Sequence, residues 1–236
     1  MIVFAGEVIL LDVEGTTSSI DFVYDVLFAY AKEHIAAFLQ TNSQDDEILE
    51  ISQALAKEAG IVADIRNGSG CTQIVLAAME LMNKDVKSTP LKALQGRIWK
   101  AGFNSGQLVA HVFDDVPSSL ANWAASGIDL RIYSSGSIEA QKLFFRHTVA
   151  GDLTPHLRGH YDTTTGPKRE QESYRKISEN IGVRPEQILF LSDVGAELDA
   201  ARSVGMATGA TLRPGNRPFE SHYNHEQIQT FTDITL

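Results

Sequence analysis

The chain of 236 residues has a single cysteine, Cys71, and no apolar run approaching the roughly 20 residues that a membrane-spanning helix needs. No disulfide can form within the chain, which fits a reducing compartment, and we expect Cys71 to be a small core residue. The N-terminus is apolar but short, contains Glu7 and lacks a basic start, so we expect a strand there and no signal peptide. These features predict a cytoplasmic protein that does not enter a membrane.

Basic side chains are scarce relative to acidic ones. The chain has 20 Lys and Arg against 30 Asp and Glu, which gives a formal net charge of −10. A nucleic-acid-binding protein needs a basic footprint, so nucleic acid is not expected as a partner, and adsorption to an anionic membrane is disfavoured. Apolar residues make up 43% of the chain, enough for a packed core, which excludes a disordered or fibrous protein.

Short apolar runs alternate with helical patterns along most of the chain. The run at residues 8–11 is uninterrupted, as is typical of a parallel strand covered on both faces. Further strands are predicted at about 130–133, 188–191 and 206–212, and helices at about 116–125, 138–148, 169–181 and 196–204. Because strands that alternate with helices imply βαβ units, the predicted fold class is α/β with a doubly wound, Rossmann-like parallel sheet.

The region from about 19 to 105 carries only helical patterns. Between residues 22 and 39, adjacent pairs of apolar residues repeat every four positions, which predicts a helix. Further helices are predicted at about 45–59, 71–83 and 90–100, with a turn at 67–70. Four successive helices with no strand between them indicate an inserted helical unit. We predict an α/β core of residues 1–18 and 106–236, and an inserted helical domain of residues 19–105.

Polar side chains stand at the ends of three predicted strands. Asp12 and Glu14 follow the first strand, Ser134 follows the second, and Asp193 follows a later one. The carboxyl ends of parallel strands lie on one edge of the sheet, so we expect these groups to converge. Carboxylates that meet at one point repel each other unless a cation lies between them, and oxygen ligands favour a hard divalent ion, above all Mg²⁺.

Backbone and cationic features near these strand ends suit an anion. Gly15 lets the backbone turn sharply, and the segments Ser134-Ser135-Gly136 and Thr165-Gly166-Pro167-Lys168 each precede a predicted helix. Each feature alone also has an ordinary explanation: a loop residue or helix cap for Asp12, a turn for the serines, a solvated side chain for Lys168. Their combination, in this order, indicates phosphoryl transfer, where catalysis is mostly positioning and charge stabilisation.

This set of motifs resembles the haloacid-dehalogenase-like phosphatases. The matching motifs are Asp-x-Glu-Gly-Thr at 12–16, Ser-Ser-Gly-Ser at 134–137, a single lysine at 168 and Ser-Asp-x-x-x-Glu at 192–197. Most members of that superfamily carry aspartate where this chain has Glu14. With that departure, and with further matching stretches at 94–99, 132–144, 172–177 and 213–216, the chain resembles the enolase-phosphatases of methionine salvage, also called acireductone synthases.

The resemblance implies roles for the acidic residues. Asp12 would be the nucleophile that forms an aspartyl-phosphate, and Glu14 would act as general acid and then as general base. One Mg²⁺ per chain would be bound by Asp12, by Asp193 and by Glu14, the last through its backbone carbonyl. Glu197 would orient the waters of the metal ion, and we prefer it to Asp199 because it lies one helical turn after Asp193.

The same resemblance implies a substrate. Ser134 and Ser135 would hold its phosphate or another part of it, with Lys168 as the cationic partner, and Thr16 would support the site from behind the ligands. The helices of residues 19–105 would be a cap over the site. The substrate would be 2,3-diketo-5-methylthiopentyl-1-phosphate, which is converted through its enol to acireductone and phosphate. We expect a monomer that acts on this small molecule in the cytoplasm, with the nucleus as a further location if the source is a eukaryote.

Three rival functions stay open from the sequence. The nearest is a phosphatase of the same superfamily that acts on another small phosphate ester. Haloacid dehalogenation uses the same nucleophile but needs neither a metal nor an acid at position 14, so Glu14 argues against it. The third, from a different class, is a non-enzymatic signalling domain phosphorylated on Asp12, which would have no use for an inserted cap.

Histidines offer one weaker alternative, a zinc site. His156 and His160 have helical spacing, but Pro155 and Gly159 favour a loop, so a zinc pair there is disfavoured. His222 and His225 lack neighbouring cysteines or carboxylates in a metal-binding pattern, and we expect both on the surface.

Overall fold

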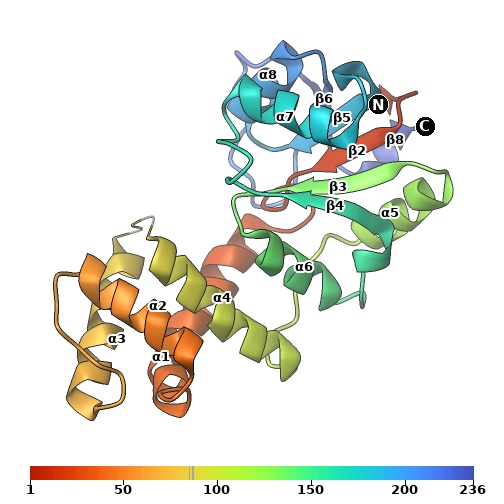
Figure 1. Cartoon of the computed structure of the whole chain (residues 1–236). Coiled ribbons are helices and arrows are strands. Elements are labelled where there is room, and N and C mark those ends of the chain that lie inside the picture. The colour runs from red at the N-terminus through yellow and green to blue at the C-terminus, as the bar shows by residue number, and fades with distance from the viewer. Residues whose placement is uncertain (85, 87) are drawn as a thin grey trace. The chain divides into compact units, whose positions relative to one another are not determined.

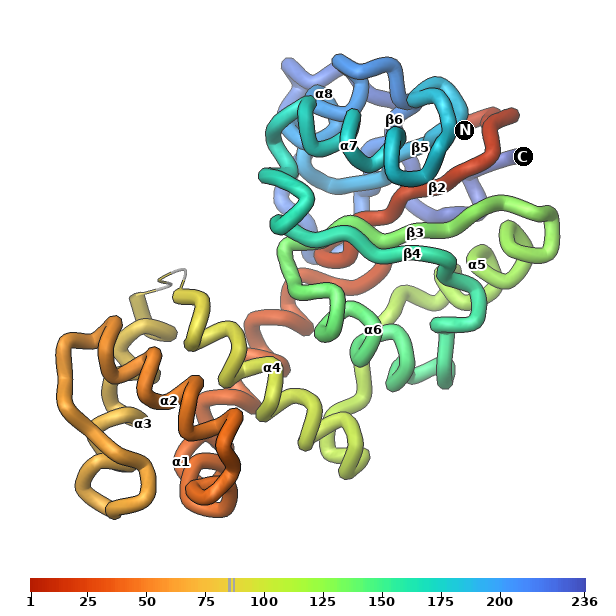
Figure 2. Tube along the Cα trace, viewed as in Figure 1, coloured from red at the N-terminus to blue at the C-terminus, as the bar shows by residue number. Residues whose placement is uncertain are grey.

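The computed structural model of the protein describes residues 1–84, 86 and 88–236, and in it the chain divides into two units. One consists of Met1–Val23 and Val109–Leu236, and the other of Tyr24–Leu108. Figure 2 traces how the chain leaves the first unit soon after its first long strand and returns to it before α5 (Asp115–Ala125). The sequence-based boundaries, after residues 18 and 105, lie a few residues earlier than these divisions.

The first unit is built on a six-stranded parallel sheet in the order β4-β3-β2-β5-β6-β7 (Figure 1). The strands are β2 (Val8–Leu11), β3 (Asp129–Tyr133), β4 (Leu157–Tyr161), β5 (Ile188–Ser192), β6 (Ala207–Thr211) and β7 (Glu226–Ile228). From β2 the chain builds outward on one side through β3 and β4, then on the other through β5, β6 and β7. The order therefore reverses at β2, and such a reversal is where open α/β sheets bind ligands. The predicted fold class is confirmed.

Helices cover both faces of this sheet, as Figure 1 shows. They are α5, α6 (Ile138–Arg146), α7 (Gln171–Ile181) and α8 (Gly195–Ser203). On the face of α7 and α8, one core cluster joins Leu10 of β2 and Phe190 of β5 to Ile177 and Leu198. Because both faces are covered, all four residues of β2 are buried, which explains its uninterrupted apolar sequence.

Smaller elements complete the unit. A two-stranded parallel pair joins β1 (Ile2–Val3) to β8 (Ile234–Thr235), so the two ends of the described chain lie side by side. Three single-turn 3₁₀ helices are η2 (Thr154–His156), η3 (Pro185–Gln187) and η4 (Phe231–Asp233). The sequence patterns did not predict β1 and β8 as separate strands, because strands of two residues carry no measurable periodicity.

The second unit is helical. It contains α1 (Ala29–Thr41), α2 (Asp46–Glu58), α3 (Gly68–Asn83) and α4 (Thr89–Asn104), preceded by a π-helical segment, η1 (Phe22–Phe28). Its core joins the apolar faces of all four helices and includes Leu39, Leu55, Ile74 and Leu94. Three helices begin with a side-chain cap, in which Asp45, Asn67 or Ser88 accepts a hydrogen bond from a backbone N–H of the first turn.

The segment Asn67-Gly68-Ser69-Gly70, predicted as a turn, is instead the start of α3. Asn67 is the helix cap, and its side chain accepts a bond from the backbone N–H of Gly70 at 2.6 Å. A Cβ at Gly70 would lie only 2.3 Å from the carbonyl oxygen of Asp64. Glycine is required here for a close approach of two backbones, and not because the helix is broken.

Strand β4 replaces the loop predicted around Pro155 and Gly159. It pairs in parallel with β3, with an irregularity in register beside Leu130 and Arg131. The Arg131 side chain lies across Gly159, where a Cβ would come within 2.9 Å of the Arg131 Nη1 atom. Glycine thus serves a tight packing contact on an edge strand, a use that short-range sequence patterns do not separate from a turn.

Candidate active site

Asp12 lies at the carboxyl end of β2, beside the end of β5. The two strands pair in register, with Leu11 opposite Leu191, so the residues that follow them meet. The Ser192 hydroxyl lies 3.1 Å from Asp12 Oδ2 and 3.2 Å from Glu197 Oε2, and its one hydrogen can serve only one carboxylate at a time. Ser192 is completely buried and was not among the residues predicted for the site, although it directly precedes Asp193.

Lys168 joins two of the carboxylates. Its Nζ lies 2.6 Å from Asp12 Oδ1 and 2.8 Å from Glu197 Oε2, and all three side chains are buried. Glu197 comes from the first turn of α8 and Asp12 from the end of β2, while Lys168 arrives from the loop before α7. Three segments far apart in sequence therefore form one buried ionic cluster.

Two tyrosines hold the lysine loop in place. The Tyr174 hydroxyl donates to the carbonyl oxygen of Lys168 at 2.7 Å, and the Tyr133 hydroxyl donates to that of Gly166 at 2.8 Å. The Tyr133 ring also lies under the ammonium group, 5.8 Å from Nζ to its centroid. Sequence reasoning missed both tyrosines, since their apolar positions in a strand and a helix read as ordinary core.

The loop after β3 brings its first serine to the site. The Ser134 hydroxyl lies 3.4 Å from Glu14 Oε2, and the backbone N–H of Gly136 donates to the Ser134 oxygen at 3.2 Å. Ser134 is buried, whereas Ser135 is exposed. The structure thus joins Ser134 to the acidic cluster through Glu14, and leaves Ser135 at the surface of the same loop.

The turn after Glu14 is closely packed. Gly15 has a φ of +71°, and a Cβ there would lie 2.5 Å from Asp193 Oδ2 and 3.0 Å from Asn216 Oδ1. Thr16 is completely buried, and its hydroxyl lies 3.0 Å from that of Thr211 at the end of β6. The Asp193 carboxylate therefore packs against the backbone at Gly15.

Four carboxylates share this site with one lysine, and the pKa values of Glu14, Asp193 and Glu197 are raised. Burial, followed by the charge of Asp12, raises the pKa of Glu14. Burial, with Asp12 and then Glu197 adding to it, raises the pKa of Asp193 to about 7. Burial and then Asp12 raise the pKa of Glu197 to about 7. The site carries more negative charge than it can hold unneutralised, which is the setting that a bound cation relieves.

Lys168 stays charged in spite of its burial. Burial by itself lowers the pKa of the ammonium group, but the opposing effects of Asp12 and Glu197 are larger together and raise it above the ordinary lysine value. A charged lysine against Asp12 suits the binding of an anionic group beside that carboxylate.

A metal ion would find oxygen ligands here. Among residues 1–84, 86 and 88–236, no group of three or more histidine, cysteine, aspartate or glutamate side chains is arranged to hold one. The ligands expected from the sequence are only two side chains, Asp12 and Asp193, together with the backbone carbonyl of Glu14. Such a set does not count as a group of three side chains. Their oxygen chemistry fits Mg²⁺, which keeps several waters and takes few protein ligands.

Other candidates from the sequence lie outside this cluster. Asp199 pairs with Arg202 at 2.6 Å and lies 3.1 Å from His225 Nε2. The expectation that His225 is on the surface is wrong: it is buried, and its Nδ1 lies 2.8 Å from the Thr208 hydroxyl. His222 is exposed, as expected.

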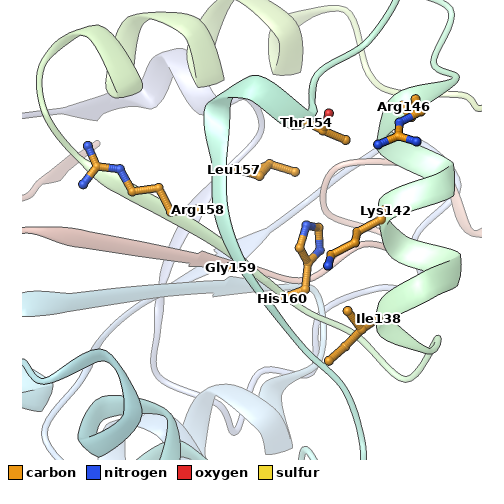
Figure 3. A pocket seen from close by; sticks show the side chains of 8 residues that line it. All are labelled: Ile138, Lys142, Arg146, Thr154, Leu157, Arg158, Gly159 and His160. Atoms are coloured by element: carbon orange, nitrogen blue, oxygen red, sulfur yellow. The ribbon is translucent and has the colours of Figure 1, made fainter.

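A separate cavity of about 510 Å³ lies along α6 and β4 (Figure 3). It is lined by Ile138, Lys142, Arg146, Thr154, Leu157, Arg158, Gly159 and His160. The His160 ring points toward Lys142, and its Nδ1 lies 3.2 Å from Gln141 Oε1. Burial and then Lys142 lower the pKa of His160 to about 4. His160 thus lines a pocket whose charged side chains, Lys142, Arg146 and Arg158, are basic.

Comparison with known proteins identifies the family. Residues 7–205 match the family model described as haloacid dehalogenase-like hydrolase. A protein named enolase-phosphatase E1 from Pseudomonas fluorescens (strain Pf0-1) is 44% identical, with 97% of this chain and 96% of that protein covered. One of the same name from Drosophila grimshawi is also 44% identical, with 98% and 97% covered. The chain belongs to the enolase-phosphatase E1 family of haloacid dehalogenase-like hydrolases. The resemblance seen in the motifs is confirmed, and the protein is an enzyme of the phosphatase class.

Solved structures agree with this placement. A yeast protein, UTR4 of Saccharomyces cerevisiae, superposes with a TM-score of 0.80 at 34% identity, with 96% of this chain and 98% of that chain covered. A dehalogenase superposes with a TM-score of 0.57 at 18% identity. This similarity shows a shared fold and does not bear on the reaction of this chain. Of the helices in the described residues, none has the length and apolarity to cross a membrane.

Proposed function

We propose that this enzyme is a Mg²⁺-dependent enolase-phosphatase of methionine salvage, which converts 2,3-diketo-5-methylthiopentyl-1-phosphate to acireductone and phosphate. The observation that carries the proposal is the fixed position of Asp12, between Lys168 on one carboxylate oxygen and Ser192 on the other. The names of the curated relatives support the choice of substrate.

Asp12 is the proposed nucleophile. Its Oδ1 also accepts a hydrogen bond from the backbone N–H of Val13 at 2.7 Å, so the carboxylate is held in one orientation. Attack on phosphorus forms a bond from a carboxylate oxygen to the phosphoryl group and breaks the bond to the leaving oxygen. Water then attacks the aspartyl-phosphate, releases phosphate and restores the Asp12 carboxylate.

Glu14 is the proposed proton donor. A raised pKa favours the protonated carboxyl, which is the form that can give its proton to the leaving oxygen. Once ionised, the same group can take a proton from the attacking water. Ser134 lies within hydrogen-bonding distance of Glu14 Oε2 and orients the carboxyl for both transfers.

Lys168, Ser134 and Ser135 are proposed to hold the phosphoryl oxygens. Lys168 is buried next to Asp12, so its charge acts where negative charge develops in the transition state. Glu197 keeps the lysine in place, and the completely buried Thr16 fixes the backbone behind Glu14.

One Mg²⁺ ion per chain is proposed to bind at Asp12, Asp193 and the Glu14 carbonyl. The raised pKa values of Asp193 and Glu197 support a cation at this place, because they mark uncompensated negative charge. When bound, the ion would stabilise negative charge on substrate oxygens, during both enolisation and phosphoryl transfer.

The helical unit is proposed to be the cap domain that the family resemblance implies. We also propose that the enzyme acts as a monomer in the cytoplasm, which size measurement in solution and localisation of the tagged protein can test.

The test is phosphate release from the diketo phosphate, with and without Mg²⁺, beside a panel of common phosphate esters. Enol absorbance is followed in the same samples. We expect a metal-dependent rise and fall of enol, and phosphate release far faster than on the panel. Asp12→Asn should abolish phosphate release. Equal rates on the whole panel would overturn the methionine-salvage assignment and leave a general phosphatase.

A further inference from the structure

Arg213, two residues after β6, is a buried cation beside the loop that carries Glu14. Its exposed fraction is 6%. Its Nε donates to the backbone carbonyl of Thr16 at 3.0 Å, and its Nη1 donates to Asp115 Oδ1 at 2.8 Å and to the Gln229 carbonyl at 3.0 Å. One guanidinium thus ties the loop after β2 to the start of α5 and to the C-terminal segment.

Aromatic rings enclose this guanidinium. Its carbon lies 4.7 Å from the centroid of Phe113 and 4.6 Å from that of Phe231. The second oxygen of Asp115 accepts a hydrogen bond from the backbone N–H of Phe231 at 2.6 Å, so the counter-ion is fixed as well. Because the Arg213 guanidinium is held on both faces and at its edge, its position is fixed. The position of the Thr16 carbonyl, to which it donates, is therefore fixed as well.

The same segment also binds the preceding carbonyl group. The Thr211 hydroxyl and the Asn216 amide donate to the Gly15 carbonyl, at 3.1 and 2.8 Å. The carbonyl oxygens of Gly15 and Thr16 therefore both accept side-chain hydrogen bonds from residues 211–216. These carbonyls belong to the second and third peptide groups after Glu14, so holding them fixes the turn that follows Glu14.

Fold stability alone does not account for an arginine here. Arg213 Nη2 is buried without a hydrogen-bond partner, which costs free energy. An ion pair of this depth can often be replaced by apolar side chains at no loss of stability. What apolar side chains cannot supply is a donor for the Thr16 carbonyl.

We propose that Arg213 is a positioning residue of the reaction. It acts through the Thr16 carbonyl and holds the turn after Asp12 so that Glu14 stays oriented for proton transfer. The inference rests on the proposed function, because it takes Glu14 to be the proton donor. Arg213 itself touches neither Asp12 nor Lys168 among the contacts described above.

The test compares Arg213→Gln with wild type on two substrates whose leaving oxygen needs a proton, glycerol 2-phosphate and the diketo phosphate. Loss of orientation should lower kcat by about 10- to 100-fold, with a much smaller change in KM. The alkaline-side limb of the kcat–pH profile should shift, because Glu14 must be protonated to act as proton donor and its environment changes. In Arg213→Ala, millimolar guanidinium ion should restore part of kcat by occupying the space between Phe113 and Phe231.

Arg131→Gln is the matched control. Arg131 also pairs with a carboxylate through two bonds, at 3.0 and 2.9 Å to Asp129, and lies over the ring of Tyr161, but it does not contact the loop after β2. Both variants should lower Tm, and only the Arg213 variant should lower kcat and shift the pH profile.

Two results separate this inference from the proposed function. If Arg213→Gln lowers Tm but keeps kcat and the pH profile, Arg213 is only structural and the inference is wrong. If wild type hydrolyses glycerol 2-phosphate but not the diketo phosphate, the substrate assignment fails, and the role of Arg213 is decided on glycerol 2-phosphate alone.

Discussion

At the scale of single residues, the site depends on one cation placed between two carboxylates. Lys168 neutralises Asp12 and Glu197 at the same time and is buried with them. Removing one member of a buried ionic cluster is costly, since it leaves the others charged and unpaired. The lysine should therefore matter for both stability and rate.

Replacing Lys168 by methionine should reduce kcat by at least about 100-fold, because a preorganised charge beside the reacting group is lost. It should also destabilise the fold by about 3–5 kcal/mol at neutral pH, since Asp12 and Glu197 would be left without their counter-ion. Urea unfolding and phosphatase assays measure the two effects. Lys176→Met, on the exposed side of α7, is the control and should change neither.

Glu14 is one methylene longer than the aspartate that most related phosphatases carry there. We expect Glu14→Asp to keep phosphate release from simple esters while losing enolisation of the diketo substrate, because the shorter side chain no longer reaches carbon. Enol absorbance and phosphate release, followed together, separate the two steps. Equal losses in both would show that the extra length has no special role in enolisation.

At the scale of elements, the turn after β2 is the critical connection. Gly15 lies in the left-handed region, and its missing Cβ leaves space that Asp193 and Asn216 fill. The turn can therefore approach the end of β5 closely only because this residue is glycine.

Gly15→Ala should abolish activity, since the new Cβ would displace Asp193 from the place where a metal ligand is proposed. Gly127→Ala is the matched control: Gly127 also has a positive φ, +87°, but a Cβ there meets nothing within 4 Å. It should cost about 1–2 kcal/mol of stability from backbone strain and leave kcat unchanged. Comparable kcat in the two variants would contradict this account of the turn.

Element prediction succeeded where a period ran for several residues and failed where glycine had a packing role. The apolar run of β2 and the amphipathic patterns of α2 and α7 can be recognised from neighbouring residues in the sequence. Gly159 and Gly70 read as turn residues, yet one packs under Arg131 and the other against the Asp64 backbone. The packing contact that requires each glycine is visible only in three dimensions.

At the scale of the whole molecule, stability should depend on pH through the acidic site. The pKa values of Asp193 and Glu197 rise from 3.8 and 4.5 to about 7. For carboxyls with raised pKa, the folded state binds more protons than the unfolded state. Their stabilising contribution is present below about pH 4 and is lost as pH rises through 7.

Without metal, the Asp193→Asn variant should therefore have a higher Tm than wild type at pH 8. At pH 4 the difference should be small, because position 193 is then neutral in both proteins. Mg²⁺ should raise the Tm of wild type more at pH 8 than at pH 5, because it binds the ionised carboxylate, and should raise that of the variant less. Thermal scans with and without Mg²⁺ measure this. Asp25→Asn, at an exposed position, should leave the pH dependence unchanged.

The sequence by itself determined the α/β class, the helical insertion and the polar residues at the strand ends, because these follow from local periodicity and from where each run stops. The tertiary structure decided which of those ends meet. Asp12 contacts Ser192 because β2 and β5 are neighbours, and Lys168 reaches both Asp12 and Glu197 because two tyrosines hold its loop. Arg213 reaches the Thr16 carbonyl because the segment after β6 folds back over the turn that follows β2. Such contacts depend on strand order and long-range packing, which no local pattern encodes.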